Sequence, residues 1–387
     1  MSTTHIELPL AEMERRIARF EERVSAALRS APPSKERVRR ALRRQGADRC
    51  PVRLKRLSLD AILRHGDALA DLFSEYPDDV VAILPYEATI GYQAEGVSPR
   101  LSAAQVLTQG MEWDDEWGTR WGHAAGGVGA TPVACPVEDW SQLDEYLAAR
   151  LPDGQAQGRF DAARTALAPH RASRYCVGLV HLALFERLHA LRGMERVFVD
   201  LAEHEAHVHR LLGALLAYLL EIVRAWGRLG ADAVFVTDDW GSQTALMISP
   251  AMWRSVFKPY YRRLTEETHG AEMDLIFHSC GNVTGIVDDL IEIGVDVLDP
   301  VQPGAMDSCE VARRFGGRIA FAGAVDVQHL LVTGMPSQVR DHVRRTMDTL
   351  GAPFGHALLI GPANVLTPDV PIENLRALFH AAHGVDA

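Results

Sequence analysis

The stretch MDLIFHSCGNVTGIVDDLIEIGVDVLDPV, residues 273–301, contains one full structural repeat. Its two apolar runs, around 274–277 and 295–298, are continuous rather than alternating, which is typical of parallel strands covered by helices on both faces. The amphipathic segment between them has the spacing of a crossover helix. This stretch therefore predicts a βαβ unit and a parallel sheet.

Similar units extend in both directions along the chain. Further apolar runs begin near residues 51, 79, 174, 231, 318 and 356, which brings the number of expected strands to eight. No Gly-x-Gly-x-x-Gly motif follows any of these runs, so a dinucleotide-binding sheet is disfavoured. We predict an α/β chain with a (β/α)8 TIM barrel over residues 49–387.

Two segments lie outside this repeat. Helical patterns at Leu10 to Leu28 and Ser34 to Gln45 predict an N-terminal helical extension over residues 1–48. Residues 101–153 are acidic, aromatic and rich in turn residues. They predict an insertion after the second strand, with a β-hairpin and a short helix.

Composition excludes several classes of partner. The net charge is −11 and the basic residues are mostly dispersed, so we expect no nucleic-acid binding. Five cysteines without a CxxC pair indicate reduced thiols, and the N-terminus lacks a basic start followed by an apolar run. The most apolar helical segment, 208–230, carries charges that give it a polar stripe. We therefore expect a cytoplasmic protein with no membrane partner.

Polar residues gather where the expected strands end. In a barrel these ends converge on one mouth, where the chemistry takes place. The candidates there are Tyr86, Glu87, Asp238, Asp239, His278, Cys280, Asp299, Gln302, Asp326 and Asn364.

His278 and Cys280 are two residues apart at the end of a strand, so their side chains point to the same side. Three interpretations stay open: two ligands of a zinc ion, a thiol nucleophile with its base, or packed polar residues. A catalytic zinc requires three protein ligands and one open position. The oxygen candidates for the third ligand are Asp239, Asp238, Glu87 and Asp326. Cys309 is a less favoured sulfur candidate, because a helix separates it from His278 and Cys280.

Asp238 and Asp239 are adjacent carboxylates that follow the apolar run AVFVT. Neighbouring side chains point to different faces, so at most one of them enters the barrel. The other would cap a helix or orient a neighbour. A catalytic role for Asp238, Asp239 and Asp326 remains the alternative to turn and capping roles.

HSCGNVTGIVDDLIEIGVDVLDPVQPGAMD (278–307), FGGRIAFAGAVDVQHLL and TPDVPIENLRAL (367–378) together resemble the uroporphyrinogen decarboxylase superfamily. KERVRRALRRQGADRCPVRL and GADAVFVTDDWGSQ extend the resemblance to nearly the whole chain from about residue 35. The resemblance implies a (β/α)8 barrel and one of two chemistries. True decarboxylases use no cofactor, whereas cobamide-dependent methyltransferases bind zinc through His-x-Cys and a further Cys.

This chain is more similar to the methyltransferase branch. The decarboxylases' Arg-Gln-Ala-Gly-Arg stretch is replaced by PVRLKRLSLDA, in which Arg53 and Arg56 are candidates for binding substrate carboxylates. Tyr86 and Glu87 stand near the position of the decarboxylases' aspartate. The third zinc ligand of the methyltransferases falls on Asn364, so an oxygen ligand such as Asp239 or Glu87 would take its place. More oxygen in the site favours methoxylated substrates over thiols.

Three hypotheses follow. The first is a zinc-assisted methyltransferase that moves a methyl group between a small substrate and a corrinoid carried by a partner protein. Asp238, Gln302, Asp326 and Asn364 would then position the substrate. The second is a metal-free decarboxylase or lyase with a carboxylated substrate on Arg53 or Arg56 and Asp238 or Asp239 as proton donor. The third is a binding barrel without chemistry. The resemblance also leaves a homodimer as an expectation.

Overall fold

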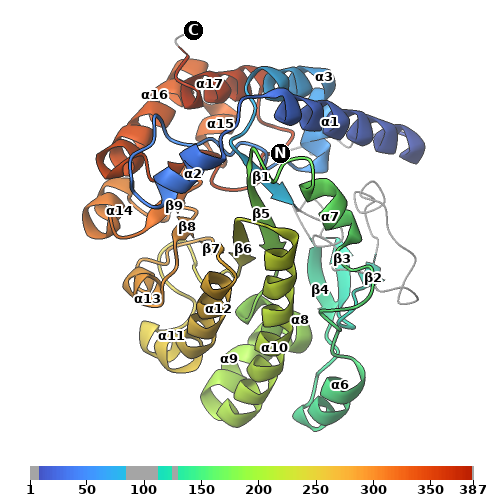
Figure 1. Ribbon diagram of the computed structural model, residues 1–387. Coiled ribbons are helices and arrows are strands. Elements are labelled where there is room, and N and C mark those ends of the chain that lie inside the picture. The colour runs from blue at the N-terminus through green and yellow to red at the C-terminus, as the bar shows by residue number, and fades with distance from the viewer. Residues whose placement is uncertain (1–7, 84–111, 124–129, 386–387) are drawn as a thin grey trace.

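The computed structural model describes residues 8–83, 112–123 and 130–385, and its centre is a curled parallel sheet (Figure 1). Within these ranges, seven strands follow the order β1-β5-β6-β7-β8-β9-β10, and every neighbouring pair is parallel. Their bounds are β1 Val80–Ile83, β5 Tyr175–Val180, β6 Ala233–Thr237, β7 Asp274–His278, β8 Val297–Asp299, β9 Ala320–Ala322 and β10 Leu358–Leu359. The predicted parallel α/β fold is confirmed.

The first expected strand forms the junction between the two edges of this sheet. Val52 pairs in parallel with Ile360, just beyond β10. The amide of Ile360 donates to Pro51 O, and the amide of Asp79, just before β1, donates to Val52 O. This short segment therefore occupies the eighth position of the barrel wall.

Helices cover the outside of the sheet, as parallel strands require (Figure 1). The helices that follow the strands or connect them are α3 Leu59–Glu75, α7 Asp161–Leu167, α8 Phe185–Arg192, α9 Met194–Glu203, α10 Glu205–Leu229, α11 Pro250–Val256, α12 Lys258–Gly270, α13 Val287–Glu292, α14 Ser308–Phe315, α15 Leu330–Thr333, α16 Pro336–Thr346 and α17 Ile372–Ala382.

The two N-terminal helices have different positions. Helix α1 (Leu10–Ser30) packs along α3, outside the sheet (Figure 1). Helix α2 (Lys35–Leu42) sends Val38 and Leu42 into the apolar cluster that fills the barrel, with Tyr175 and Val80 from the beginnings of strands. It therefore closes the end of the barrel opposite the expected site. The division of the chain at residue 48 stays a prediction.

The described part of the insertion forms a small antiparallel sheet of β2 Glu112–Asp114, β3 Arg120–His123 and β4 Ala130–Ala134. A 3-10 turn (Trp140–Gln142) and α6 (Leu143–Ala149) follow. The sheet adds one strand to the hairpin that the sequence predicts.

Helix α10 is long and rich in apolar residues. Among the described residues it is the one helix long and apolar enough to cross a membrane, and 44% of its most apolar window is buried in the protein. The buried core helix of a globular protein passes the same test. Here α10 packs against α12, α9 and β5.

Candidate metal centre

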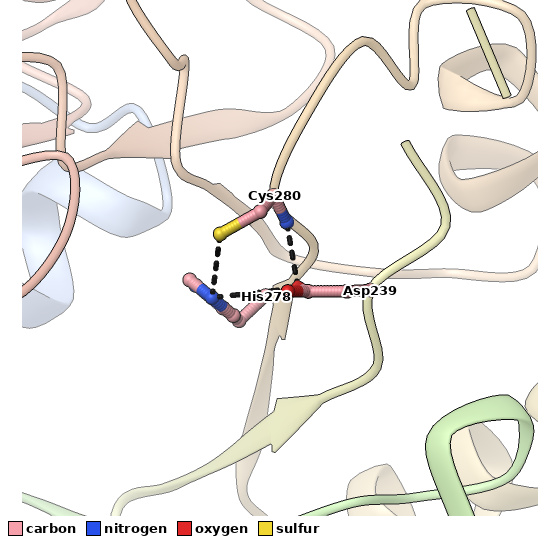
Figure 2. A group of neighbouring side chains, drawn as sticks. All are labelled: Asp239, His278 and Cys280. Carbon is pink, nitrogen blue, oxygen red and sulfur yellow. Dashed lines mark hydrogen bonds and ion pairs between the residues drawn. The ribbon is translucent and has the colours of Figure 1, made fainter. Parts of the chain in front are cut away.

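Asp239, His278 and Cys280 converge at the carboxyl ends of two neighbouring strands (Figure 2). Strand β7 ends at His278, and Asp239 lies just after the end of β6. His278 Nε2 is 3.5 Å from Cys280 Sγ and 3.7 Å from Asp239 Oδ1. One ligand atom from each residue lies within 4.8 Å of the other two.

This spacing fits a tetrahedral metal ion. With metal–ligand bonds of about 2.0–2.3 Å, two ligands of a tetrahedral zinc lie roughly 3.3–3.8 Å apart. Both distances from His278 Nε2, 3.5 and 3.7 Å, fall in that range. Imidazole nitrogen, cysteine sulfur and carboxylate oxygen are all zinc donors. The three residues thus suit a zinc site with one position left open.

Asp299, at the end of β8, fixes the orientation of the His278 ring. His278 Nδ1 lies 2.5 Å from Asp299 Oδ1. Arg53 Nη2 donates to Asp299 Oδ2 at 2.9 Å, and Arg56 Nη1 donates to Oδ1 at 3.0 Å. Burial raises the pKa of Asp299, but the charges of Arg53 and Arg56 outweigh it and hold that pKa well below its usual range.

An ionised Asp299 has consequences for both His278 and the arginines. A carboxylate only accepts hydrogen bonds, so His278 Nδ1 carries the hydrogen. In the neutral ring, Nε2 then offers its lone pair toward Cys280 and Asp239, as in the carboxylate–histidine–metal arrangement. Arg53 and Arg56, expected to hold a substrate carboxylate, instead bind a carboxylate of the chain itself.

Cys280 carries the sulfur of the group and is half-buried. Burial, followed by the charge of Asp239, raises the pKa of its thiol. Without a cation the sulfur is therefore protonated at neutral pH, which disfavours the nucleophile interpretation. Asn364 Nδ2 lies 3.3 Å from Cys280 Sγ, and the Asn364 side chain is exposed. Asn364 thus stands beside the three-residue group, where the resemblance implies a second cysteine sulfur as the third ligand.

The loops that carry Asp239 and Cys280 touch through their backbones. A Cβ atom added at Gly281 would lie 2.3 Å from the carbonyl carbon and oxygen of Gly241, and the φ of Gly281 is +81°. The amide of Gly241 donates to Cys280 O, and Gln302 Oε1 accepts from the amide of Gly281. Gln302 therefore supports the Cys280 loop. The amide of Cys280 also donates to Asp239 Oδ1 at 2.8 Å.

The other two aspartates make capping hydrogen bonds. Asp238 is fully buried and accepts from the first backbone amides of α8 and from the hydroxyl of Tyr261. Of the adjacent pair, Asp239 is the residue that faces His278. Asp326 accepts from the amides of Gln328, His329 and Leu330 in its own turn rather than contacting the group at His278.

Tyr86 and Glu87 lie outside the described residues, so their assignment as substrate-binding residues stays a prediction.

Sequence reasoning missed two residues near the group. Burial, then the charges of Asp239 and Asp238, raise the pKa of Glu186 well above its usual range. His181 directly follows β5, and its Nδ1 lies 2.9 Å from Thr237 Oγ1. The strand-end rule that selected His278 could have found His181. Glu186 carries no such signal, because it belongs to a helix.

Comparison with protein families assigns the chain. The model named "Uroporphyrinogen decarboxylase (URO-D)" matches residues 184–385, a little over half of the chain. The chain belongs to the uroporphyrinogen decarboxylase family.

Curated relatives match a little under half of the chain. The chain is 29% identical over 187 residues to a uroporphyrinogen decarboxylase of Xanthomonas euvesicatoria, which covers 46% of this chain and 50% of that protein. It is 26% identical over 180 residues to one of Legionella pneumophila, covering 46% of each. The chain thus spans about half the length of these relatives.

Among solved structures, a methyltransferase from Methanosarcina mazei matches with a TM-score of 0.67 and 17% identity. The match covers 92% of this chain and 99% of that one. At this identity the likeness shows a common fold.

Proposed function

We propose that this chain is a zinc-assisted methyltransferase that moves a methyl group between a small, methoxylated substrate and a corrinoid carried by a partner protein. The observation that carries the proposal is the spacing of Asp239, His278 and Cys280, with ligand atoms of His278 3.5 and 3.7 Å from the other two. The pair His278 and Cys280, in the stretch 278–307 that resembles the superfamily, supports the methyltransferase branch of the family. Cytoplasmic localisation and a homodimer stay predictions.

Different residues of the chain would bind the metal ion and the substrate. Asp239, His278 and Cys280 would hold zinc. Asp299 fixes the orientation of the His278 ring through the contact with Nδ1. Bound zinc would supply Lewis acidity that polarises the heteroatom carrying or accepting the methyl group. Asn364 is exposed beside Cys280 and would contact the substrate. An oxygen ligand at Asp239 makes the donor set harder than one with two sulfurs, which favours ether oxygen over thiol substrates.

Metal analysis of protein purified without chelators or nickel tests this proposal. We expect one zinc per chain, lost in His278→Ala and Cys280→Ala and weakened in Asp239→Ala. Cys309→Ala is the matched control, because Cys309 is a free, exposed cysteine on α14. A metal-free protein that is fully active, or zinc content unchanged in both Cys280→Ala and Cys309→Ala, would contradict the proposal.

The second candidate is a metal-free decarboxylase or lyase, favoured by the names of the curated relatives. Arg53 and Arg56 would bind a substrate carboxylate only in competition with Asp299, to which both are paired. Loss of turnover in Arg56→Met together with full activity in the presence of a chelator would favour this candidate. Inhibition by a chelator that added zinc reverses would favour the methyltransferase.

A further inference from the structure

A cavity of about 100 Å³ lies between the end of β5 and helix α10. Its wall is mostly apolar and aromatic, with Trp117 from the insertion, Phe160 from the loop before α7, and Leu215 and Trp226 from α10. Trp226 and Phe160 pack edge to face with ring centroids 5.4 Å apart. Such a volume exceeds the roughly 10–15 Å³ that one water needs, and it is below the ~150 Å³ of a cavity that takes benzene.

The charged groups on this wall are paired with opposite charges of the chain itself. Arg159 donates to both carboxylate oxygens of Glu116, and both side chains are nearly buried. Arg187 donates to Asp115 Oδ2 at 3.1 Å. Burial, followed by the charge of Arg187, lowers the pKa of His181 to about 4, so this ring is neutral at pH 7. A charged occupant would lose its hydration without meeting an unpaired counter-charge.

Within the described ranges, the Nε atom of Arg187 is a polar atom on the wall that has no hydrogen-bond partner. Arg187 is only 5% exposed, and its Nε–H has no hydrogen-bond partner among the described residues. The guanidinium lies over the Trp117 ring, 4.5 Å from its centroid, and both side chains line the cavity. A buried donor without an acceptor is unfavourable, and an occupant with an oxygen atom in reach would satisfy it.

We propose that this cavity binds a small, neutral organic group, the size of a five-membered ring, that presents one acceptor oxygen to Arg187 Nε. The ring would contact the aromatic wall, and the oxygen would accept the unused hydrogen bond. Ethers and carbonyl compounds have this chemistry, whereas carboxylates and amines do not fit the paired charges.

The cavity adjoins the candidate metal centre through His181. Its Nδ1 lies 2.9 Å from Thr237 Oγ1, and Thr237 pairs with His278 in the β6–β7 register. If the proposed methyl transfer holds, the cavity would take the unreactive part of an ether substrate. This role of the cavity rests on the proposed function, whereas its binding of a small neutral ring does not.

Binding of tetrahydrofuran and cyclopentane to the full chain tests the cavity directly. The two probes have nearly the same size, and only tetrahydrofuran has an acceptor oxygen. We expect tetrahydrofuran to bind with a Kd on the order of 1 mM. Cyclopentane is the reference for burial of a ring of this size without an acceptor oxygen. Saturation-transfer NMR and the fluorescence of Trp117 and Trp226 would follow the titration.

Two variants of α10 show where the probes bind. Leu215→Phe fills the cavity and keeps every polar pair, so both probes should bind at least about tenfold more weakly. Leu216→Phe makes the same change one residue further on the same helix, outside the lining, and should leave both affinities unchanged. Arg187→Met should weaken the binding of tetrahydrofuran about tenfold relative to that of cyclopentane, because the ether oxygen loses its hydrogen-bond donor. Because it also removes the partner of Asp115, its fold is checked by circular dichroism.

Absence of saturable tetrahydrofuran binding, or equal effects of Leu215→Phe and Leu216→Phe, would overturn the cavity proposal. His278→Ala separates the two proposals, because it should abolish zinc binding and leave tetrahydrofuran binding intact. Protein that binds tetrahydrofuran but no zinc would refute the methyltransferase and retain the cavity site.

Discussion

The Nδ1 atom of His278 lies 2.5 Å from Oδ1 of Asp299, on the neighbouring strand, and two arginines hold the same carboxylate from the other side. This relationship decides which nitrogen of His278 faces Cys280 and Asp239. It makes the candidate metal centre depend on a residue that would not touch the metal.

Asp299→Asn is expected to weaken zinc binding about 10- to 100-fold. The amide keeps the shape of the side chain but loses its charge, so Arg53 and Arg56 are left uncompensated near the metal. Competition with a chromophoric chelator measures the affinity. Asp326→Asn, which alters a capping aspartate elsewhere, should bind zinc like the unmodified protein; equal affinities in all three proteins would show that Asp299 has no such role.

Asn364→Cys is expected to strengthen zinc binding by about tenfold or more, which corresponds to at least ~1.4 kcal/mol. The side chain is already next to Cys280 Sγ, so the new thiolate would add a soft ligand to the group. Asn364→Ala serves as the control for the loss of the amide. A cysteine variant that binds zinc no better than the alanine variant would mean that position 364 does not reach the metal.

Gly281→Ala is expected to disrupt the metal centre, because its Cβ would collide with the Gly241 backbone at 2.3 Å. Gly304→Ala provides a matched control: its φ is +84°, close to the +81° of Gly281, but nothing lies within 4 Å of its added Cβ. Gly304→Ala should cost about 1–2 kcal/mol and keep zinc. Gly281→Ala should cost more and lose zinc, as followed by chemical denaturation and metal content; identical behaviour would rule out the loop contact as the cause.

The free energy of unfolding is expected to fall as the pH drops from about 6.5 to about 4, in part because of His189. Burial lowers the pKa of His189 to about 4, and its Nε2 has no hydrogen-bond partner among the described residues. The unfolded chain binds a proton near pH 6.5, whereas the folded chain resists it until the pH approaches 4. This stability is therefore present above pH 6.5 and is lost on acidification.

His189→Leu should make that pH dependence shallower, by up to about 3 kcal/mol between pH 7 and pH 4. Urea denaturation at several pH values measures it. His207→Leu, a change on the exposed face of α10, should retain the slope of the unmodified protein. A slope that His189→Leu leaves unchanged would assign the effect to other buried histidines.

Much of the fold follows from local pattern. The apolar runs at 174, 231 and 273 became β5, β6 and β7, because continuous apolar stretches of that length are buried only as covered strands. The side chains of His278 and Cys280 lie together because of the two-residue period of a strand. These features depend on neighbours in the sequence.

The remaining features of the candidate site depend on contacts between distant residues. Alternation along the chain could not tell which of Asp238 and Asp239 faces the group, since the amides at the start of α8 bind Asp238. Arg53 and Asp299 are 246 positions apart in the sequence, so their pairing could not be foreseen. The charge of Arg53 alone therefore suggested that it binds a substrate carboxylate rather than an aspartate of the chain. Pairings of this kind appear only once the barrel is assembled.

Because residues 51–53 close the barrel, the candidate metal centre depends on the whole ring of strands. The family match covers 184–385 and includes Asp239, His278 and Cys280, yet Arg53 and Arg56 come from the segment that joins β10 to β1. An excised C-terminal half would keep all three ligand candidates and lose the charges that hold Asp299. Inheritance of the motif by recombination would thus transfer the ligands without their electrostatic support, unless the first strand position came with them.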